Sequence, residues 1–202
     1  LELNLDIPPQ TLGSHRLVEA AHQADVWRAQ KLIEHGGFYF DWDMLLLRPP
    51  TDLHPFACVM GVEGLVAGYQ EVLGVSAIGA QPGSAFLQCW LNGMASVYNP
   101  REYVTHSTVL AREIALAFPA SVRVLPSNSF YFPGWQTESM AWLFGPSERV
   151  PPEELETALE GAWGIHLFES HANFKHYADG LTLDALRQLP CNLTTIIESL
   201  LD

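Results

Sequence analysis

The chain has 202 residues, of which 48% are hydrophobic, and this apolar content is enough for one substantial core. The 11% of aromatic residues, six of them Trp, argue against a disordered chain, because such a composition buries enough apolar surface to offset chain entropy. Against 23 acidic residues there are only 10 scattered basic ones, so the net charge of −13 argues against binding to a nucleic-acid backbone and favours a carboxylate-held cation for any phosphorylated ligand.

The first predicted elements surround an acidic pair. Residues 14–35 are predicted to form a helix, because apolar residues recur at helical spacing, Ser14 is placed to cap it and Gly36 is placed to end it. Residues 38–40 are a short aromatic β-type run, and residues 44–47 are an apolar run that Arg48-Pro49-Pro50 ends. Asp41-Trp42-Asp43 lies between the two runs, so two carboxylates are expected at the end of a buried strand.

The rest of the chain mixes predicted strands and helices without a repeat or an evident linker. Strands are predicted at residues 56–60, 72–80, 122–125 and 164–168. Helices are predicted at residues 84–97 and 107–118, each with Ser at or near its N-cap, at 151–160, and at 182–202 with a break at Pro190. One mixed α/β domain over residues 1–202 is therefore expected.

Cysteine usage and processing signals add little. Cys58, Cys89 and Cys191 include no close pair, so neither a CxxC metal knuckle nor a dense disulfide framework is expected. Asn192-Leu193-Thr194 matches the N-glycosylation pattern, which matters only in the secretory pathway. No apolar run approaches the roughly 20 residues of a membrane span, and the first residues lack the features of a signal peptide. We expect no membrane span, targeting or anchor segment in this chain.

The acidic pair carries the strongest chemical signal. Asp-x-Asp places two carboxylates on one short backbone segment, where both can converge on a hard cation directly or through water. Such a cation can bridge the two phosphates of a nucleotide-sugar and stabilise charge on the leaving diphosphate. The Asp-x-Asp pattern alone is common by chance, so the neighbouring sequence decides whether it indicates a metal site.

The acidic pair belongs to a series of residue types in a fixed order. An acidic and a basic residue lie three apart on the predicted helix, and two glycines, an aromatic residue, the acidic pair and an apolar run follow. The residues are Asp25, Arg28, Gly36, Gly37, Tyr39, Asp41 and Asp43. The block resembles the sugar-binding region of the DXD-motif glycosyltransferases, notably family 32 with its alpha-1,4-galactosyl-, alpha-1,4-N-acetylglucosaminyl- and initiating alpha-1,6-mannosyltransferases. A similar block occurs in the clostridial glucosylating toxins. Residues 124–135 and 164–171 continue the resemblance more faintly, whereas Thr105-His106-Ser107 departs from a Gly-Pro step in many relatives.

The resemblance implies roles for single residues. Asp41 would contact the donor ribose or a metal-bound water, and Asp43 would ligate the metal and the diphosphate, so these two are the expected catalytic residues. His166 would be a further metal or diphosphate contact. The expected metal ligands are Asp41, Asp43 and His166, and the expected cofactor-binding residues are Asp25, Arg28, Gly36, Gly37 and Tyr39.

The resemblance also implies a fold and a reaction. The fold is the GT-A type of α/β nucleotide-diphospho-sugar transferase, a mixed sheet flanked by helices. The family's opening βα unit has no counterpart before Leu1, so we expect an N-terminally incomplete catalytic domain. The implied reaction transfers a hexosyl unit from a UDP- or GDP-hexose to a glycan or glycolipid hydroxyl, with Mn²⁺ or Mg²⁺, with retained configuration, in the Golgi lumen or secretory pathway. No well-placed carboxylate pair indicates double displacement.

Other functions and roles stay open. The alternative to the transferase is a catalytically degenerate glycan-binding or partner subunit. A Mg-dependent aspartyl-phosphate phosphatase fits less well, because Lys175 lies too close to the acidic residues with which it would hold the metal. Asp25 and Arg28 alone would be a surface ion pair, and His166 alone a core histidine, with His171 as the fallback ligand. The remaining candidates are Tyr131, Trp135 and Trp142 for sugar stacking, with a core role as the default, and Glu138 and Glu169 as acid, base or nucleophile.

Overall fold

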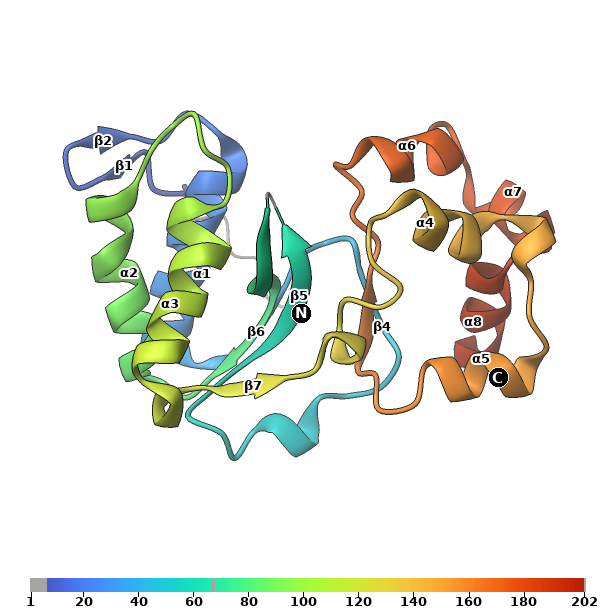
Figure 1. Cartoon of the computed structure of the whole chain (residues 1–202), viewed down its shortest axis with the longest axis horizontal. Coiled ribbons are helices and arrows are strands. Elements are labelled where there is room, and N and C mark those ends of the chain that lie inside the picture. Colours follow the sequence, from blue (N-terminus) through green and yellow to red (C-terminus); the bar gives the residue numbers. More distant parts are fainter. Residues whose placement is uncertain (1–6, 67, 202) are drawn as a thin grey trace. The chain divides into compact units, whose positions relative to one another are not determined.

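The computed structural model describes residues 7–66 and 68–201, and the contacts between residues cluster in two compact units (Figure 1). Unit 1 comprises Leu1–Phe40 and Pro50–Leu125, and unit 2 comprises Asp41–Pro49 and Pro126–Asp202. The chain therefore passes from unit 1 into unit 2 at the acidic pair, returns at Pro50, and leaves unit 1 again after Leu125.

Unit 1 is built on a mixed sheet with the strand order β3-β6-β5-β7. Strand β3 (Gly37–Phe40) and strand β5 (Cys58–Val66) both pair antiparallel with β6 (Tyr69–Ala80). Strand β7 (Arg123–Leu125) pairs parallel with β5. A small hairpin of β1 (Thr11–Leu12) and β2 (His15–Arg16) precedes the first helix.

Three helices pack together beside this sheet (Figure 1). They are α1 (Ala20–His35), α2 (Ala85–Val97) and α3 (Leu110–Ala117), and a π-helical turn, η2 (Thr105–Val109), leads into α3. Short 3-10 turns are η1 (Thr51–Leu53) and η3 (Pro119–Ser121). The core between helices and sheet includes fully buried Phe86, Trp90 and Met60, the kind of large apolar side chains whose burial drives folding.

Unit 2 combines two short paired strands with several short helices. Strand β4 (Met44–Leu46) runs antiparallel to β8 (Gly164–His166). The helices are α4 (Thr137–Phe144), α5 (Pro152–Ala158), α6 (Ala172–Ala178), α7 (Leu183–Gln188) and α8 (Asn192–Leu201), with 3-10 turns η4 (Ser127–Ser129) and η5 (Pro146–Glu148). Helix α4 contacts α6 and α8, and α5 contacts α8.

The predicted fold class is confirmed: the protein is mixed α/β, with a mixed sheet flanked by helices, and is consistent with a GT-A-like fold. The prediction that the chain is a single domain stays a prediction.

Within residues 7–66 and 68–201, no helix combines the length and the apolar character needed to cross a membrane.

The structure corrects two predicted helix starts. Helix α1 begins at Ala20, and Ser14 lies instead in the turn of the β1–β2 hairpin beside Gly13, whose φ of 58° suits a tight turn. The helix predicted from Ser107 begins as the π-helical turn η2, and Ser107 lies inside that turn. By contrast, Ser84 does cap α2, accepting a hydrogen bond from the backbone N–H of Leu87 at 3.4 Å. Helices α4 and α6 were not predicted.

The glycosylation pattern at Asn192 has a structural role in this fold. The Asn192 side chain is buried, and its amide donates to the carbonyl oxygens of Trp142 at 2.7 Å and Glu148 at 3.1 Å. Its oxygen accepts from the backbone N–H of Val150 at 3.0 Å. Because these hydrogen bonds engage the Asn192 side chain at the start of α8, its amide nitrogen is not available as a glycan acceptor. All three cysteines are free.

Candidate functional site

The acidic pair lies in a tight turn between two strands. Strand β3 ends at Phe40, and β4 begins at Met44, whose backbone N–H donates to the carbonyl of Asp41 at 3.1 Å. Strand β3 is only half-buried and lies at one end of the strand order, which corrects the expectation of a buried strand. The turn leaves Asp41 and Asp43 half-buried and Trp42 exposed.

The register of β4 against β8 brings a histidine to the acidic pair. Met44 lies opposite His166, and the carbonyl of Asp43 accepts the backbone N–H of Leu167 at 3.0 Å. As a result Nε2 of His166 lies 3.2 Å from Oδ1 of Asp43. One ligand atom from each of Asp41, Asp43 and His166 falls within 4.8 Å of the others. The structure thus brings together the three residues expected as metal ligands.

The backbone after β8 closes around Asp43. The backbone N–H of Glu169 donates to Oδ2 of Asp43 at 2.8 Å. The preceding residue, Phe168, has a φ of 54°, a left-handed conformation that a bulky residue rarely adopts. Strained backbone of this kind is concentrated at functional sites, where the surrounding structure holds it. The strained backbone therefore supports a functional role for the segment beside Asp43.

The surroundings of Asp43 favour its charged form. Burial by itself raises the pKa of this carboxyl group, but the hydrogen bond and charge of His166 and the backbone N–H of Glu169 outweigh it, so that the pKa is lower than its ordinary value. Asp43 is thus held as a carboxylate at neutral pH.

The donor set fits a divalent cation. Two carboxylates and one imidazole are ligand types that divalent metals accept, and a carboxylate with two hydrogen bonds still has lone pairs to offer. Nδ1 of His166 is buried without a hydrogen-bond partner among the described residues, so the ring retains an unused polar atom. His171, the alternative histidine, has a different role: its Nδ1 accepts the backbone N–H of Asn173 at 3.2 Å at the start of α6.

In unit 1, Asp25 and Arg28 form a buried pair at 3.4 Å, with side chains only 7% and 4% exposed. The interpretation as a surface ion pair is therefore wrong. Arg28 is fixed by further contacts: Nη1 donates to the carbonyl of Val75 at 2.6 Å, and the guanidinium lies 4.5 Å from the centre of the Tyr39 ring. Three of the five expected cofactor-binding residues are thus in one cluster.

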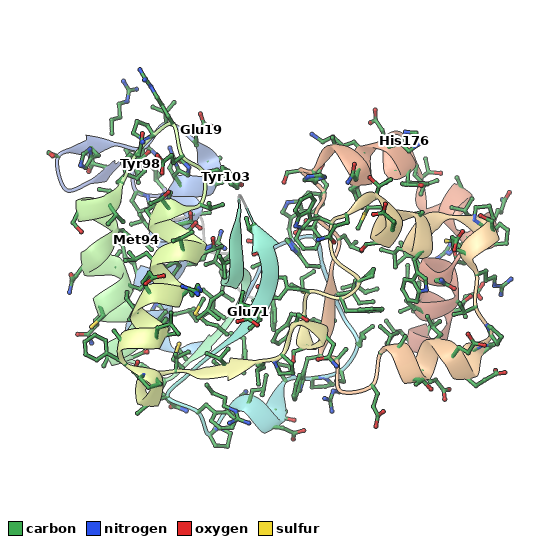
Figure 2. The ribbon with its side chains drawn as sticks, in the orientation of Figure 1. Glu19, Glu71, Met94, Tyr98, Tyr103 and His176 are labelled. Atoms are coloured by element: carbon green, nitrogen blue, oxygen red, sulfur yellow. The ribbon has the colours of Figure 1, made fainter. Side chains whose placement is uncertain are left out.

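A second group of rings joins this cluster. His106 lies on the π-helical turn, with Nε2 3.2 Å from Oδ2 of Asp25, and its ring packs edge-on against His22 at 4.6 Å. Nδ1 of His22 lies 3.1 Å from the hydroxyl of Tyr98. Figure 2 shows Tyr98 and Tyr103, both ring neighbours of His22, with Glu19 at the same end of unit 1.

Burial and the charge of His106 lower the pKa of His22, although Asp25 and Glu19 act in the opposite direction. Sequence reasoning did not select His22, yet it lies three residues before Asp25 on the same helix face, a spacing that was available as a signal. His106 was noted only as a departure from the family pattern, and π-helical turns are frequent at functional sites.

The two glycines differ in what surrounds them. A Cβ on Gly36, whose φ is 68°, would lie 2.5 Å from Cδ and 2.8 Å from the backbone N of Pro82. A Cβ on Gly37, whose φ is 90°, would meet no atom within 4 Å. Gly36 is therefore required by the packing of unit 1, whereas Gly37 leaves its backbone open to approach.

The other candidates from the sequence are dispersed within unit 2. Tyr131 is buried and its ring meets that of His166 at 5.9 Å, while Trp135 packs on His171 at 4.7 Å and Trp142 on Phe132 at 5.2 Å. Glu138 is exposed in the first turn of α4. Glu169 contacts the acidic pair directly, through its backbone N–H.

Comparison with known proteins concerns the part of the chain that contains the acidic pair. Residues 8–60 match the family described as the glycosyltransferase sugar-binding region containing a DXD motif. Glucan organizing enzyme 1 of Cryptococcus neoformans var. grubii serotype A is 27% identical over 137 residues, which are 65% of this chain and 37% of the relative. No solved structure matches the chain. The chain is a DXD glycosyltransferase-like protein, and it aligns with little more than a third of the fungal relative's length.

Proposed function

We propose that this chain carries the catalytic site of a metal-dependent hexosyltransferase, which moves a hexosyl unit from a nucleoside-diphosphate sugar to a hydroxyl of a glycan or glycolipid. The observation that carries the proposal is the convergence of Asp41, Asp43 and His166 in a chain whose residues 8–60 match a sugar-binding glycosyltransferase region. The name of the fungal relative refers to glucan, which supports a polysaccharide acceptor. We place the protein in the secretory pathway on the same family grounds.

Asp41, Asp43 and His166 would hold the cation, which when bound neutralises charge on the donor diphosphate and its leaving form. An imidazole ligand favours Mn²⁺ over Mg²⁺, because Mg²⁺ is bound mainly by oxygen and water. The low pKa of Asp43 keeps its carboxylate charged at neutral pH, and the backbone N–H of Glu169 holds it in one orientation.

In unit 1, we assign the nucleotide or the donor sugar to the cluster of Asp25, Arg28 and Tyr39. Arg28 is held by the carbonyl of Val75 and by the ring of Tyr39, so little side-chain freedom would be lost on binding. The open backbone at Gly37 allows a ligand to approach closely, whereas we assign Gly36 a structural role.

We propose that transfer retains the anomeric configuration without a covalent intermediate. The bond from the anomeric carbon to the diphosphate oxygen breaks, the acceptor oxygen attacks on the same face, and the acceptor proton passes to the departing diphosphate. This route rests on the family resemblance, and not on the positions of Glu138, which is exposed on α4, or of Glu169, whose backbone N–H contacts Asp43. A glycosyl group trapped on an Asp or Glu side chain would contradict it.

Calorimetric titration with UDP, GDP and their hexose conjugates, with and without Mn²⁺, tests the proposal. Wild-type protein is expected to bind one nucleotide class only when Mn²⁺ is present, and Asp43→Ala is expected to lose that binding. Asp184→Ala is the matched control, because the Asp184 side chain is 88% exposed on α7. Equal binding with and without Mn²⁺, or binding that survives in Asp43→Ala, would overturn the metal-dependent donor site. Metal binding without any sugar transfer or donor hydrolysis would favour a glycan-binding subunit.

A further inference from the structure

A pocket of about 410 Å³ lies within unit 2, beside the acidic pair. Its lining comes from the acidic turn, from the segment after β8, and from α6, α7 and the loop between them. The residues that carry the argument are Trp42, Glu169, Phe174, Lys175, Asp179 and Thr182.

Two walls of this pocket are fixed to Asp43. Trp42 stands between the two carboxylates in the sequence, and 81% of its surface is exposed. Glu169 and Leu167, on the other wall, donate backbone hydrogen bonds to the side chain and the carbonyl of Asp43 at 2.8 Å and 3.0 Å. A ligand in the pocket would therefore lie next to the proposed metal ligands.

The lining combines surfaces that a sugar ring needs. The rings of Trp42 and Phe174 offer flat apolar faces, which suit the C–H face of a pyranose. Carboxylates from Glu169 and Asp179, the ammonium group of Lys175 and the hydroxyl of Thr182 offer hydrogen-bonding partners for its hydroxyl groups. The volume lies near the lower end of the range of about 300–1,000 Å³ for small-molecule sites, which suits the end of a saccharide.

The charges distinguish the kind of sugar. Two carboxylates face one ammonium group in this lining, and the whole chain carries a net charge of −13. A diphosphate or an acidic sugar would be repelled by such a surface, whereas a neutral hexose would not. The pocket therefore does not fit the anionic part of a nucleotide-sugar.

We propose that this pocket binds the terminal neutral hexose of the acceptor, with Trp42 as the stacking platform. Calling this hexose the acceptor rests on the transferase function proposed above. The binding of a neutral saccharide in the pocket is independent of that function. The position of Trp42 between two metal-ligand candidates explains why a large aromatic ring is left exposed there: it joins the acceptor surface to the site of transfer.

Two-dimensional NMR tests the proposal by titrating the chain with maltose, cellobiose and lactose, without metal or nucleotide. At least one disaccharide is expected to shift the indole N–H of Trp42 and the backbone amides of Glu169, Lys175 and Thr182. Trp42→Ala is expected to weaken this binding about tenfold or more, because an aromatic stacking partner is lost. Phe118→Ala, which removes a 59% exposed ring in unit 1, is the matched control and leaves binding unchanged.

Two further measurements test whether the pocket prefers a neutral sugar to an acidic one. D-glucuronate is expected to bind more weakly than D-glucose, and Asp179→Asn, but not the exposed Asp184→Asn, is expected to reduce the difference. No shift with any disaccharide, equal binding by Trp42→Ala, or tighter binding of glucuronate would overturn the proposal. Since neither Mn²⁺ nor nucleotide is present, these outcomes are independent of the calorimetric test of the donor site.

Discussion

Asp25 and Arg28 lie three residues apart on α1, as Asp184 and Arg187 do on α7, but only the first pair is buried. The side chains of the second pair are 88% and 68% exposed, and such surface pairs contribute little to stability because water screens them. A buried pair behaves differently: removing one partner leaves an uncompensated charge in the interior.

We therefore expect Arg28→Ala to lower the free energy of unfolding by about 3–5 kcal/mol. Arg187→Ala is expected to leave it unchanged within error. Urea unfolding followed by circular dichroism compares the two variants directly, and similar losses in both would show that burial of Arg28 does not determine its contribution.

At Asp43 the expected effect depends on pH. The pKa of this group is below the ordinary value of 3.8, so its stabilising contacts are fully present above that value and are lost as the pH falls through the lower pKa of the folded chain. Asp43→Asn should lower the free energy of unfolding by about 1–3 kcal/mol at neutral pH, because a hydrogen bond to a charged group is weakened. The difference from wild type should shrink below pH 3.8. Urea unfolding at a series of pH values checks this, and a difference that is constant down to acid pH would contradict it.

At the scale of elements, the junction of α1 and β3 depends on two glycines with different surroundings. Both have left-handed backbones, with φ of 68° at Gly36 and 90° at Gly37, which cost an L-residue about 1–3 kcal/mol. Only Gly36 also faces the backbone and ring of Pro82 at distances that exclude a Cβ.

Gly36→Ala should therefore lower the free energy of unfolding well beyond the roughly 1–3 kcal/mol expected for Gly37→Ala. Chemical denaturation of both variants measures the difference. Equal losses would mean that Pro82 moves aside at little cost and that the backbone conformation alone requires glycine.

For the whole molecule, we expect stability to depend on divalent cations, because the chain has a net charge of −13 and a cluster of two carboxylates with a histidine. A metal that binds only the folded chain stabilises it by about 2.7 kcal/mol when its concentration is 100 times the Kd. For a chain of this size that corresponds to a Tm increase of about 5–11 °C.

Mn²⁺ should thus raise the Tm of the wild type, and of Asp184→Ala as the control, but not that of Asp43→Ala. Excess chelator should reverse the increase. Scanning calorimetry gives the measurement, and an equal increase in Asp43→Ala would place the metal elsewhere.

Much of the secondary structure was predictable, because it follows from local patterns. Strand β3, strand β6 and helix α2 lie close to their predicted positions, since alternating or helical apolar spacing is a property of adjacent residues. The start of α1 was missed, because Ser14 has the residue type of an N-cap but lies in the β1–β2 hairpin. Such a short hairpin depends on tertiary contacts, which a local pattern does not show. Helix α6 was missed although His171 caps it, because His is an uncommon N-cap.

The sequence by itself determined the acidic turn, the Asp25–Arg28 spacing and the two glycines, because each is a pattern of residues close together in the chain. The tertiary structure alone decided the rest. The register of β4 and β8 placed His166 beside Asp43, and the left-handed backbone at Phe168 precedes the Glu169 N–H that donates to it. The packing of η2 against α1 buried Asp25 with His106. Pairing register and burial depend on residues far apart in the chain, and no local pattern specifies them.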